Sequence, residues 1–182
     1  MSKEYGIPEK PKSGSLQNQP VNTNLTNPTN FKFLLPKIPN SVYFCTAITV
    51  PGQSCDATII KSGKGLAVKI PGQEVVHGDL SFNFLVNEDL SNYRELQDWF
   101  RTTLAFTDFN GVANIANWMS NEGQIIFLSN KKTPTMRMSF YGIFPKNISS
   151  LGLNSADTDA SNITATCTLG FTYYEMEPYP NA

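Results

Sequence analysis

The sequence predicts a mainly β protein: an antiparallel β-sandwich or partly closed barrel with one packed α-helix and a long protruding hairpin. Three observations lead to this fold class. Several segments alternate apolar and polar residues, which is typical of half-buried strands. Only one segment has the 3.6-residue period of an amphipathic helix. Finally, a glycine-bearing stretch between two Pro-Gly-Gln sequences has few large apolar residues, as a hairpin outside the core would.

The chain of 182 residues divides into three parts by composition. Residues 1–30 carry four prolines and many amide and hydroxyl side chains, with only scattered large apolar residues. Such a segment buries too little to order itself. It is therefore either a disordered terminus or an extended arm that orders against a neighbouring subunit. We expect one β-rich domain over residues 31–177 and a short tail over residues 178–182.

The first half of this domain reads as strands and a hairpin. Strands are predicted at Phe31–Leu35 and Val42–Ile48, separated by a turn at residues 36–40, and Pro51-Gly52 and Pro71-Gly72 each predict a turn or bend. Residues 57–60 and 66–70 form the arms of the predicted hairpin. Its tip is Lys61, Ser62, Gly63, Lys64 and Gly65, and Lys69 adds a third lysine. This hairpin is poorly equipped to pack on a core of its own.

The middle of the domain holds a strand and the single firm helix. Leu80, Phe82, Phe84 and Val86 alternate in a strand over residues 78–87. An amphipathic helix is predicted over residues 92–103, with Asn92 and Glu95 at the spacing of a capping pair and Trp99 in the core. Residues 106–121 are ambiguous between a short helix and a loop. A short buried strand at 125–128 and a turn at 131–134 complete this part.

Two strands end the domain. Met136–Phe144 is predicted to be closed by Pro145, which cannot donate a hydrogen bond to a sheet. Ile163–Tyr174 alternates for twelve residues without a break. One set should face a core and the other a wet, uncharged surface. The apolar set is Ile163, Ala165, Cys167, Leu169, Phe171 and Tyr173, and the other set is Thr164, Thr166, Thr168, Gly170, Thr172 and Tyr174.

Composition excludes several classes of function. Fourteen Lys and Arg face fifteen Asp and Glu, so the chain has no basic excess of the kind that nucleic-acid binders use. Three cysteines without a secretory leader argue against a disulfide framework. No apolar run reaches the roughly 20 residues that span a bilayer, so we expect a soluble chain without membrane insertion.

The motifs of catalysis and metal binding are missing from the sequence. His77 is the only histidine, and neither a nucleophile elbow nor a close Cys-x-x-Cys pair is present. The sequence around Gly63-Lys64-Gly65 does not match a phosphate loop, and Asp157 and Asp159 read as a solvated acidic loop. We expect no catalytic, metal-binding or cofactor-binding residues. An enzyme and a monomeric adaptor module remain alternative classes.

The order of the elements resembles the tail tube proteins of contractile-tailed bacteriophages. The resemblance covers Phe31 to about Glu177. It rests on the ordered combination of Val50-Pro51-Gly52, the hairpin of 56–75, Gly78-Asp79-Leu80-Ser81-Phe82-Asn83-Phe84 before the Trp-bearing helix, Gly142-Ile143-Phe144-Pro145-Lys146-Asn147-Ile148, and the Thr-rich strand ending in Tyr173-Tyr174-Glu175. It implies hexameric rings that stack into the tube for DNA ejection. The same fold serves type VI secretion tubes and tube-like rings at a baseplate, and the long N-terminal segment leaves the baseplate ring as an alternative.

This resemblance also implies partners and surfaces. The partners would be the chain itself, the tail sheath and the baseplate proteins, with phage DNA passing through unbound; the chain would lie in the virion after assembly in the host cytoplasm. The polar hairpin would contact a neighbouring subunit or ring through Lys61, Ser62, Gly63, Lys64, Gly65 and Lys69. The lumen would be lined by Thr164, Thr166, Thr168 and Thr172, unless this is only the solvent face of a sandwich.

Overall fold

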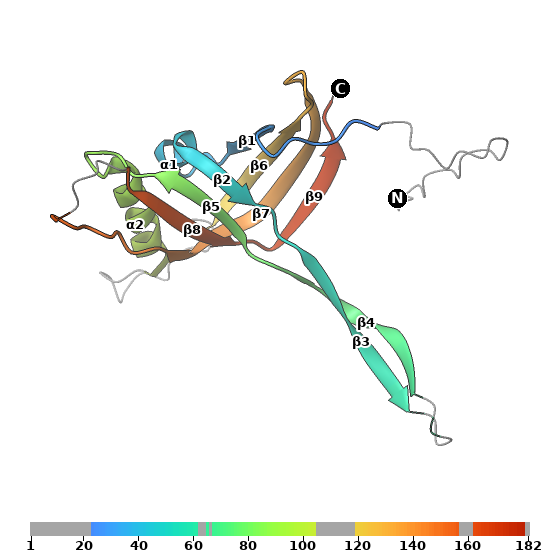
Figure 1. Ribbon diagram of the computed structural model, residues 1–182. Coiled ribbons are helices and arrows are strands. Elements are labelled where there is room, and N and C mark those ends of the chain that lie inside the picture. The colour runs from blue at the N-terminus through green and yellow to red at the C-terminus, as the bar shows by residue number, and fades with distance from the viewer. Residues whose placement is uncertain (1–22, 62–64, 66, 105–118, 157–161, 181–182) are drawn as a thin grey trace.

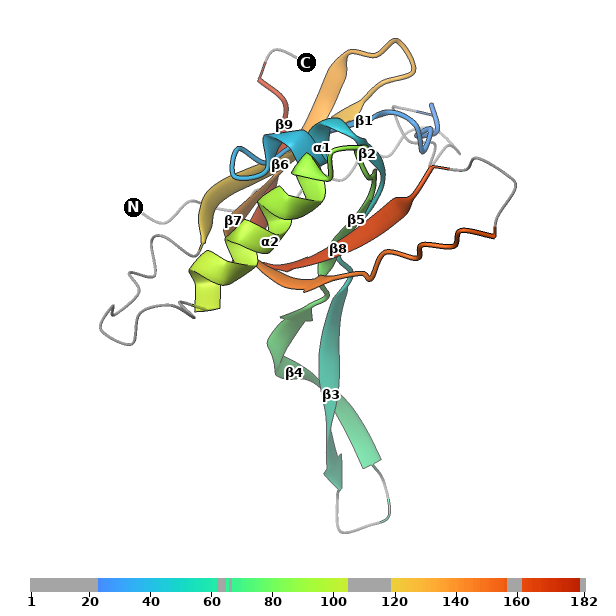
Figure 2. The same ribbon diagram turned by 90° about the vertical axis from the view of Figure 1, so that its left-hand side faces the viewer.

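The structure of the protein is a computed structural model, which describes residues 23–61, 65, 67–104, 119–156 and 162–180. An antiparallel sheet rolls into a partly closed barrel, two helices lie together beside it, and a two-stranded hairpin projects away from it (Figures 1 and 2). The predicted fold class is confirmed. The elements in order are β1 (Phe31–Leu34), α1 (Pro39–Tyr43), β2 (Cys45–Thr49), β3 (Gln53–Lys61), β4 (Ala67–His77), β5 (Leu80–Leu85), α2 (Ser91–Leu104), β6 (Ser120–Leu128), β7 (Pro134–Ile148), β8 (Thr164–Gly170) and β9 (Tyr173–Pro178).

Strand β7 organises the sheet, whose strand order is β1-β6-β7-β8-β5-β2. One edge of β7 pairs with β6. Its other edge pairs with β9 along its first half and with β8 along its second half. Between the halves, Gly142 has φ +63°, and a Cβ there would overlap the side chain of Thr172. Only glycine meets both demands, so the strand bends at this residue.

The path of β7 corrects one prediction. The strand does not close at Pro145 but continues to Ile148. Its register with β8 shifts between Pro145 and Asn147, which marks a bulge. A proline is tolerated in a strand at such a bulge because its missing N–H is not needed for the ladder.

The alternation predicted for Ile163–Tyr174 is also broken. Ala165, Cys167 and Leu169 are buried as predicted. However, β8 ends at Gly170 and β9 begins at Tyr173, opposite the bend of β7 at Gly142. The phase changes there: Tyr173 is 47% exposed, while Tyr174 packs against the core.

Two more local predictions were wrong. Val42 and Tyr43 lie in the one-turn helix α1, so the strand that was predicted to begin at Val42 begins at Cys45. The sequence Pro71-Gly72 lies inside β4, where the register with β3 shifts between Cys55 and Ala57, and not in a turn between elements. At Pro71-Gly72 the pairing with β3, which the local sequence does not contain, decides the structure.

Helix α2 confirms the predicted amphipathic helix. Leu96 and Trp99 are buried in the core, as predicted for Trp99. Asn92 and Glu95 do not form a capping pair. The Asn92 side chain is fully buried and donates from Nδ2 to the carbonyl of Leu85 at 2.7 Å, and Glu95 accepts from the hydroxyl of Ser41 on α1 at 3.2 Å. Both residues therefore attach α2 to other elements.

The remaining predictions for this region have mixed outcomes. Leu80, Phe82 and Phe84 are buried along β5, and Val86 packs against the core, as their alternation predicts. The short strand predicted at 125–128 is the end of the longer β6. The predicted turn after it is confirmed, with Lys132 at φ +63°. Most of the ambiguous segment falls within residues 105–118, outside the described residues.

Replacing the buried amide tests the attachment of α2. Because Asn92 also accepts from the backbone N–H of Asn87 at 3.2 Å, Asn92→Ala leaves two partly buried backbone groups without partners. We expect the free energy of unfolding to fall by about 1–3 kcal/mol in urea titrations. The matched variant Asn40→Ala, at an exposed amide, should change it by less than about 0.5 kcal/mol. Equal effects of the two variants would contradict this role of Asn92.

Candidate functional site

The hairpin of β3 and β4 stands apart from the rest of the molecule. Its two strands pair only with each other among the described residues. They run away from the sheet (Figures 1 and 2). At roughly 3.4 Å per residue, the nine residues of β3 reach about 30 Å. The hairpin therefore offers both of its faces to a partner.

This hairpin exposes apolar residues that a free monomer would normally bury. Six large aliphatic side chains on it are between 39% and 55% exposed: Ile59, Ile60, Val68, Ile70, Val75 and Val76. Such a concentration of exposed apolar surface marks an interaction site. The sequence prediction underestimated this apolar surface, because it weighed the lysines and glycines of the tip more heavily.

The register of the hairpin divides its outer half into two faces. Ile60 lies opposite Val68, and Thr58 opposite Ile70, on one face. Lys69 lies opposite Ile59 on the other face, which Lys61 shares because it is two residues further along β3. Gly65, at the tip, is exposed with φ +79°. The predicted contact residues Ser62, Gly63 and Lys64 lie outside the described residues.

Aromatic side chains hold the base of the hairpin. His77, the last residue of β4, packs with ring centroids 5.2 Å from Tyr174 and 6.0 Å from Phe171. Phe140 of β7 packs against both of these rings. The described residues contain no group of three or more His, Cys, Asp or Glu side chains that could hold a metal ion. His77 packs at the base of the hairpin.

The four predicted threonines lie away from the core. Thr164, Thr166 and Thr172 are exposed and Thr168 is half-buried. Within β8 they alternate with the buried Ala165, Cys167 and Leu169. Pairing adds polar residues from the neighbouring strand: Ser81 lies opposite Thr168 and Asn83 opposite Thr166. Thr166 donates to Oδ1 of Asn83 at 2.9 Å.

We call this surface the polar face and define it by Ser81, Asn83, Thr164, Thr166 and Thr168. None of these side chains carries a charge. A charged pair lies near its end, where the Lys146 ammonium contacts the Asp79 carboxylate at 2.7 Å, and the two charges offset each other. At Gly170 the threonine row is interrupted, since the ring of Phe144 occupies the space that a Cβ would need. Ser81 and Asn83 were not predicted as part of the surface, although the alternation of β5 contains the signal.

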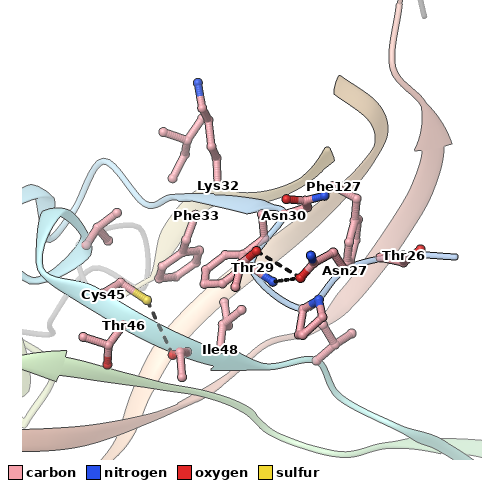
Figure 3. Close-up of a pocket in the computed structure, with 16 residues that line it drawn as sticks. Thr26, Asn27, Thr29, Asn30, Lys32, Phe33, Cys45, Thr46, Ile48 and Phe127 are labelled. Carbon is pink, nitrogen blue, oxygen red and sulfur yellow. Dashed lines mark hydrogen bonds between the residues drawn. The ribbon is translucent and has the colours of Figure 1, made fainter. Parts of the chain in front are cut away.

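A hollow of about 830 Å³ separates the two end strands of the sheet, β1 and β2. Figure 3 shows Phe33 and Ile48 pointing toward it and Lys32 pointing away. Burial raises the pKa of the Cys45 thiol beside it to about 11, so this group is protonated at neutral pH and is a poor nucleophile. The hollow offers apolar and amide contacts and no activated group.

No helix among the described residues is long and apolar enough to cross a bilayer. The acidic pair Asp157 and Asp159 lies outside the described residues.

Comparison with known families identifies the chain. The family model for phage tail tube proteins matches residues 39–177, which include the hairpin and the polar face. The chain belongs to the phage tail tube protein family. Its role is therefore structural, as a component of the tail tube, and the sequence resemblance to this family is confirmed. No curated protein matches the sequence.

Solved structures share the fold of this tail tube protein. A chain of the cap that terminates the tube of the anti-feeding prophage has a TM-score of 0.62 at 15% identity, covering 91% of this chain and 100% of that chain. A chain from the sheath-tube complex of the PVC extracellular contractile injection system has a TM-score of 0.60 at 15% identity, covering 85% of this chain and 93% of that chain. At such identities the likeness is one of fold.

The reactivity of the thiols tests the burial of β8 and the exposure of the hairpin. Burial raises the pKa of Cys167 to about 12, and Cys55 is exposed on the hairpin. Because the thiolate is the reactive form, we expect iodoacetamide at pH 8 to modify Cys55 first and Cys167 only after unfolding. Mass spectrometry of timed samples, with a urea-unfolded control, measures the order. Modification of Cys167 in the folded protein as fast as Cys55 would contradict the burial of β8.

Proposed function

We propose that the chain assembles into hexameric rings, which stack into the hollow tail tube of a contractile-tailed phage, and that DNA leaves the capsid through this tube. The observation that carries the proposal is the hairpin of β3 and β4, with its exposed aliphatic side chains. A monomer gains nothing from this apolar surface, whereas a ring or stack buries it against a neighbour. Membership of the tail tube family supports the proposal.

In this proposal the hairpin joins one subunit to another within or between rings. Its contact residues include the lysines Lys61, Lys64 and Lys69 together with Ser62, Gly63 and Gly65 at the tip. Burying an exposed aliphatic side chain completely contributes about 1.5–3 kcal/mol, and roughly half of that remains for a side chain that is half-exposed. Six such side chains contribute several kcal/mol per hairpin, enough to support a durable contact.

The polar face is proposed to line the bore, with Thr172 continuing the row beyond the bend. A conduit for DNA should offer few cations, because each lysine or arginine that holds a phosphate adds affinity that every ring repeats. Thr164, Thr166 and Thr168 present hydroxyl and methyl groups, and neighbouring Asn83 is also uncharged. Such a face binds water through its hydroxyl groups and has no cation that would retain the DNA.

The proposed partners are other copies of this chain, the tail sheath and the baseplate, with DNA in transit only. The likeness to a chain of a sheath-tube complex supports a sheath partner. We also propose a virion location after assembly in the host cytoplasm, no membrane insertion, no cofactor or metal and no enzymatic activity. Residues 1–30 are proposed to act as an arm on an adjacent subunit or ring. A specialised ring at the baseplate, or a type VI-like tube subunit, is the second candidate.

Assembly can be tested with the purified chain. We expect rings or tubes in negative-stain micrographs. Each pair of adjacent subunits should bury more than about 1,000 Å² of surface. Ile60→Asn combined with Val68→Asn, or deletion of residues 61–65, should block assembly and leave the melting temperature of the monomer unchanged. Leu90→Asn and Leu153→Asn, at exposed leucines outside both the hairpin and residues 1–30, are the controls. A strictly monomeric mass at high concentration, with no copies assembled in phage particles, would overturn the proposal.

Added cations test the bore. If the polar face lines it, Thr166→Lys with Thr168→Lys should leave tubes intact and make particles release DNA more slowly, most strongly at low salt, where phosphate contacts are least screened. DNA ejection is followed by fluorescence of an intercalating dye. The control adds the same two charges in an exposed loop through Asn154→Lys and Ser155→Lys. Equal ejection by the two variants at low salt would contradict a bore-lining position.

A further inference from the structure

A second surface on the chain combines two tyrosines with three carboxylates. Tyr141 of β7 and Tyr173 of β9 are cross-strand partners whose rings stack with centroids 4.7 Å apart and 21° between their planes. Glu122 of β6 lies opposite Tyr141 on the other side. Glu175 and Glu177 follow Tyr173 at two-residue steps, which place them on the same face. We call these five residues the acidic tyrosine patch.

The patch carries a negative potential. The pKa of Tyr141 is raised by desolvation first and then by the charges of Glu175 and Glu122, with a contribution from Glu177. The Arg137 guanidinium contacts the Glu177 carboxylate at 3.0 Å. Glu122 and Glu175 have no ion-pair partner within the described part of the chain. Two carboxylates beside the half-buried ring of Tyr141 and the exposed ring of Tyr173 form a surface suited to cations, since an ammonium interacts with both groups.

The lysine-bearing face of the hairpin is the matching surface. Lys61 and Lys69 are both exposed, and neither has an ion-pair partner among the described residues. The two lysines are diagonal neighbours across the strand pair, with side chains about 7–8 Å apart at their bases. Ile59 is a neighbour of both, directly opposite Lys69 and two residues before Lys61, and it is 53% exposed. This face therefore presents two cations around one apolar side chain, complementary to two carboxylates around a pair of rings.

From this complementarity we infer that the acidic tyrosine patch is the docking site for the lysine face of the hairpin of a second copy of this chain. The hairpin extends away from its own sheet (Figures 1 and 2), so it is not available to the patch of the same chain. The inference rests on the proposed function, in which the hairpin joins subunits. It adds the surface of the neighbouring copy to which the hairpin binds. The opposite hairpin face, with Ile60, Val68 and Ile70, remains available for another contact.

Charge reversal tests the pairing. Glu122→Lys with Glu175→Lys, and separately Lys61→Glu with Lys69→Glu, should each raise the concentration for half-maximal assembly at least about tenfold, a change that corresponds to the loss of modest ionic contacts. All four substitutions in one chain should restore assembly. Glu88→Lys with Asp98→Lys makes the same charge change at exposed sites outside the patch and should leave assembly unaltered. Normal assembly of E122K/E175K, or no restoration in the combined variant, would overturn the inference.

Cross-linking of unmodified protein gives an independent readout. A carbodiimide joins an ammonium to a carboxylate only when they are in contact. In assembled material, we expect mass spectrometry to find Lys61 or Lys69 joined to Glu122 or Glu175 of another copy, and the monomer should lack these products. Cross-links from the patch to a sheath protein in phage particles, in place of these products, would assign the patch to the sheath and overturn the inference.

Different results would contradict the proposed function of the hairpin and the inferred docking site. If the chain that lacks residues 61–65 assembles normally, the hairpin does not join subunits and the proposed function itself loses its support. If that chain fails to assemble while E122K/E175K assembles normally, the hairpin retains its role and only the receptor assignment is wrong.

Discussion

The pairing of both edges of β7 is the constraint on which the rest of the structure depends. This strand holds β6 on one side and β8 with β9 on the other, and it bends where Gly142 adopts a positive φ. The half beyond the bend positions β8 and, through it, β5, so it orients the polar face. The half before the bend positions the acidic tyrosine patch. One backbone conformation therefore sets the relative direction of the uncharged polar face, which we propose lines the bore, and the acidic tyrosine patch, which we propose binds a hairpin.

Sequence patterns predicted the elements whose structure depends on neighbours along the chain. The alternation around Phe82 and the period around Trp99 identified β5 and α2, and the glycine-rich tip identified the hairpin. Two of the errors in the strands lie where a distant strand decides. Pro145 is accommodated because β8 shifts register beside it, and the phase of Tyr173 changes because β9 follows the bent half of β7. A local pattern contains no information about either partner.

The candidate surfaces show the same division. The threonine row was predictable from β8 alone, because polar and apolar residues alternate along this strand and so lie on opposite faces. Its extension by Ser81 and Asn83 required the register with β5. For the hairpin, the sequence indicated that it would not join the core, but the separation of Ile60 from Lys69 onto opposite faces follows from the pairing of β3 with β4. Composition predicts that a surface exists, and register determines what it presents.

The exposed hairpin also has a consequence for the chain before it assembles. The outer edges of β3 and β4 carry backbone groups that no other described strand pairs with, and the aliphatic side chains of the hairpin favour addition of a further strand. Lys61 and Lys69 oppose such addition, because charges on an edge strand repel a second identical edge. Newly made chains are thus most prone to aggregation while they wait for a partner. Rapid incorporation into a growing end protects them, and overproduction without the other tail components should favour insoluble protein.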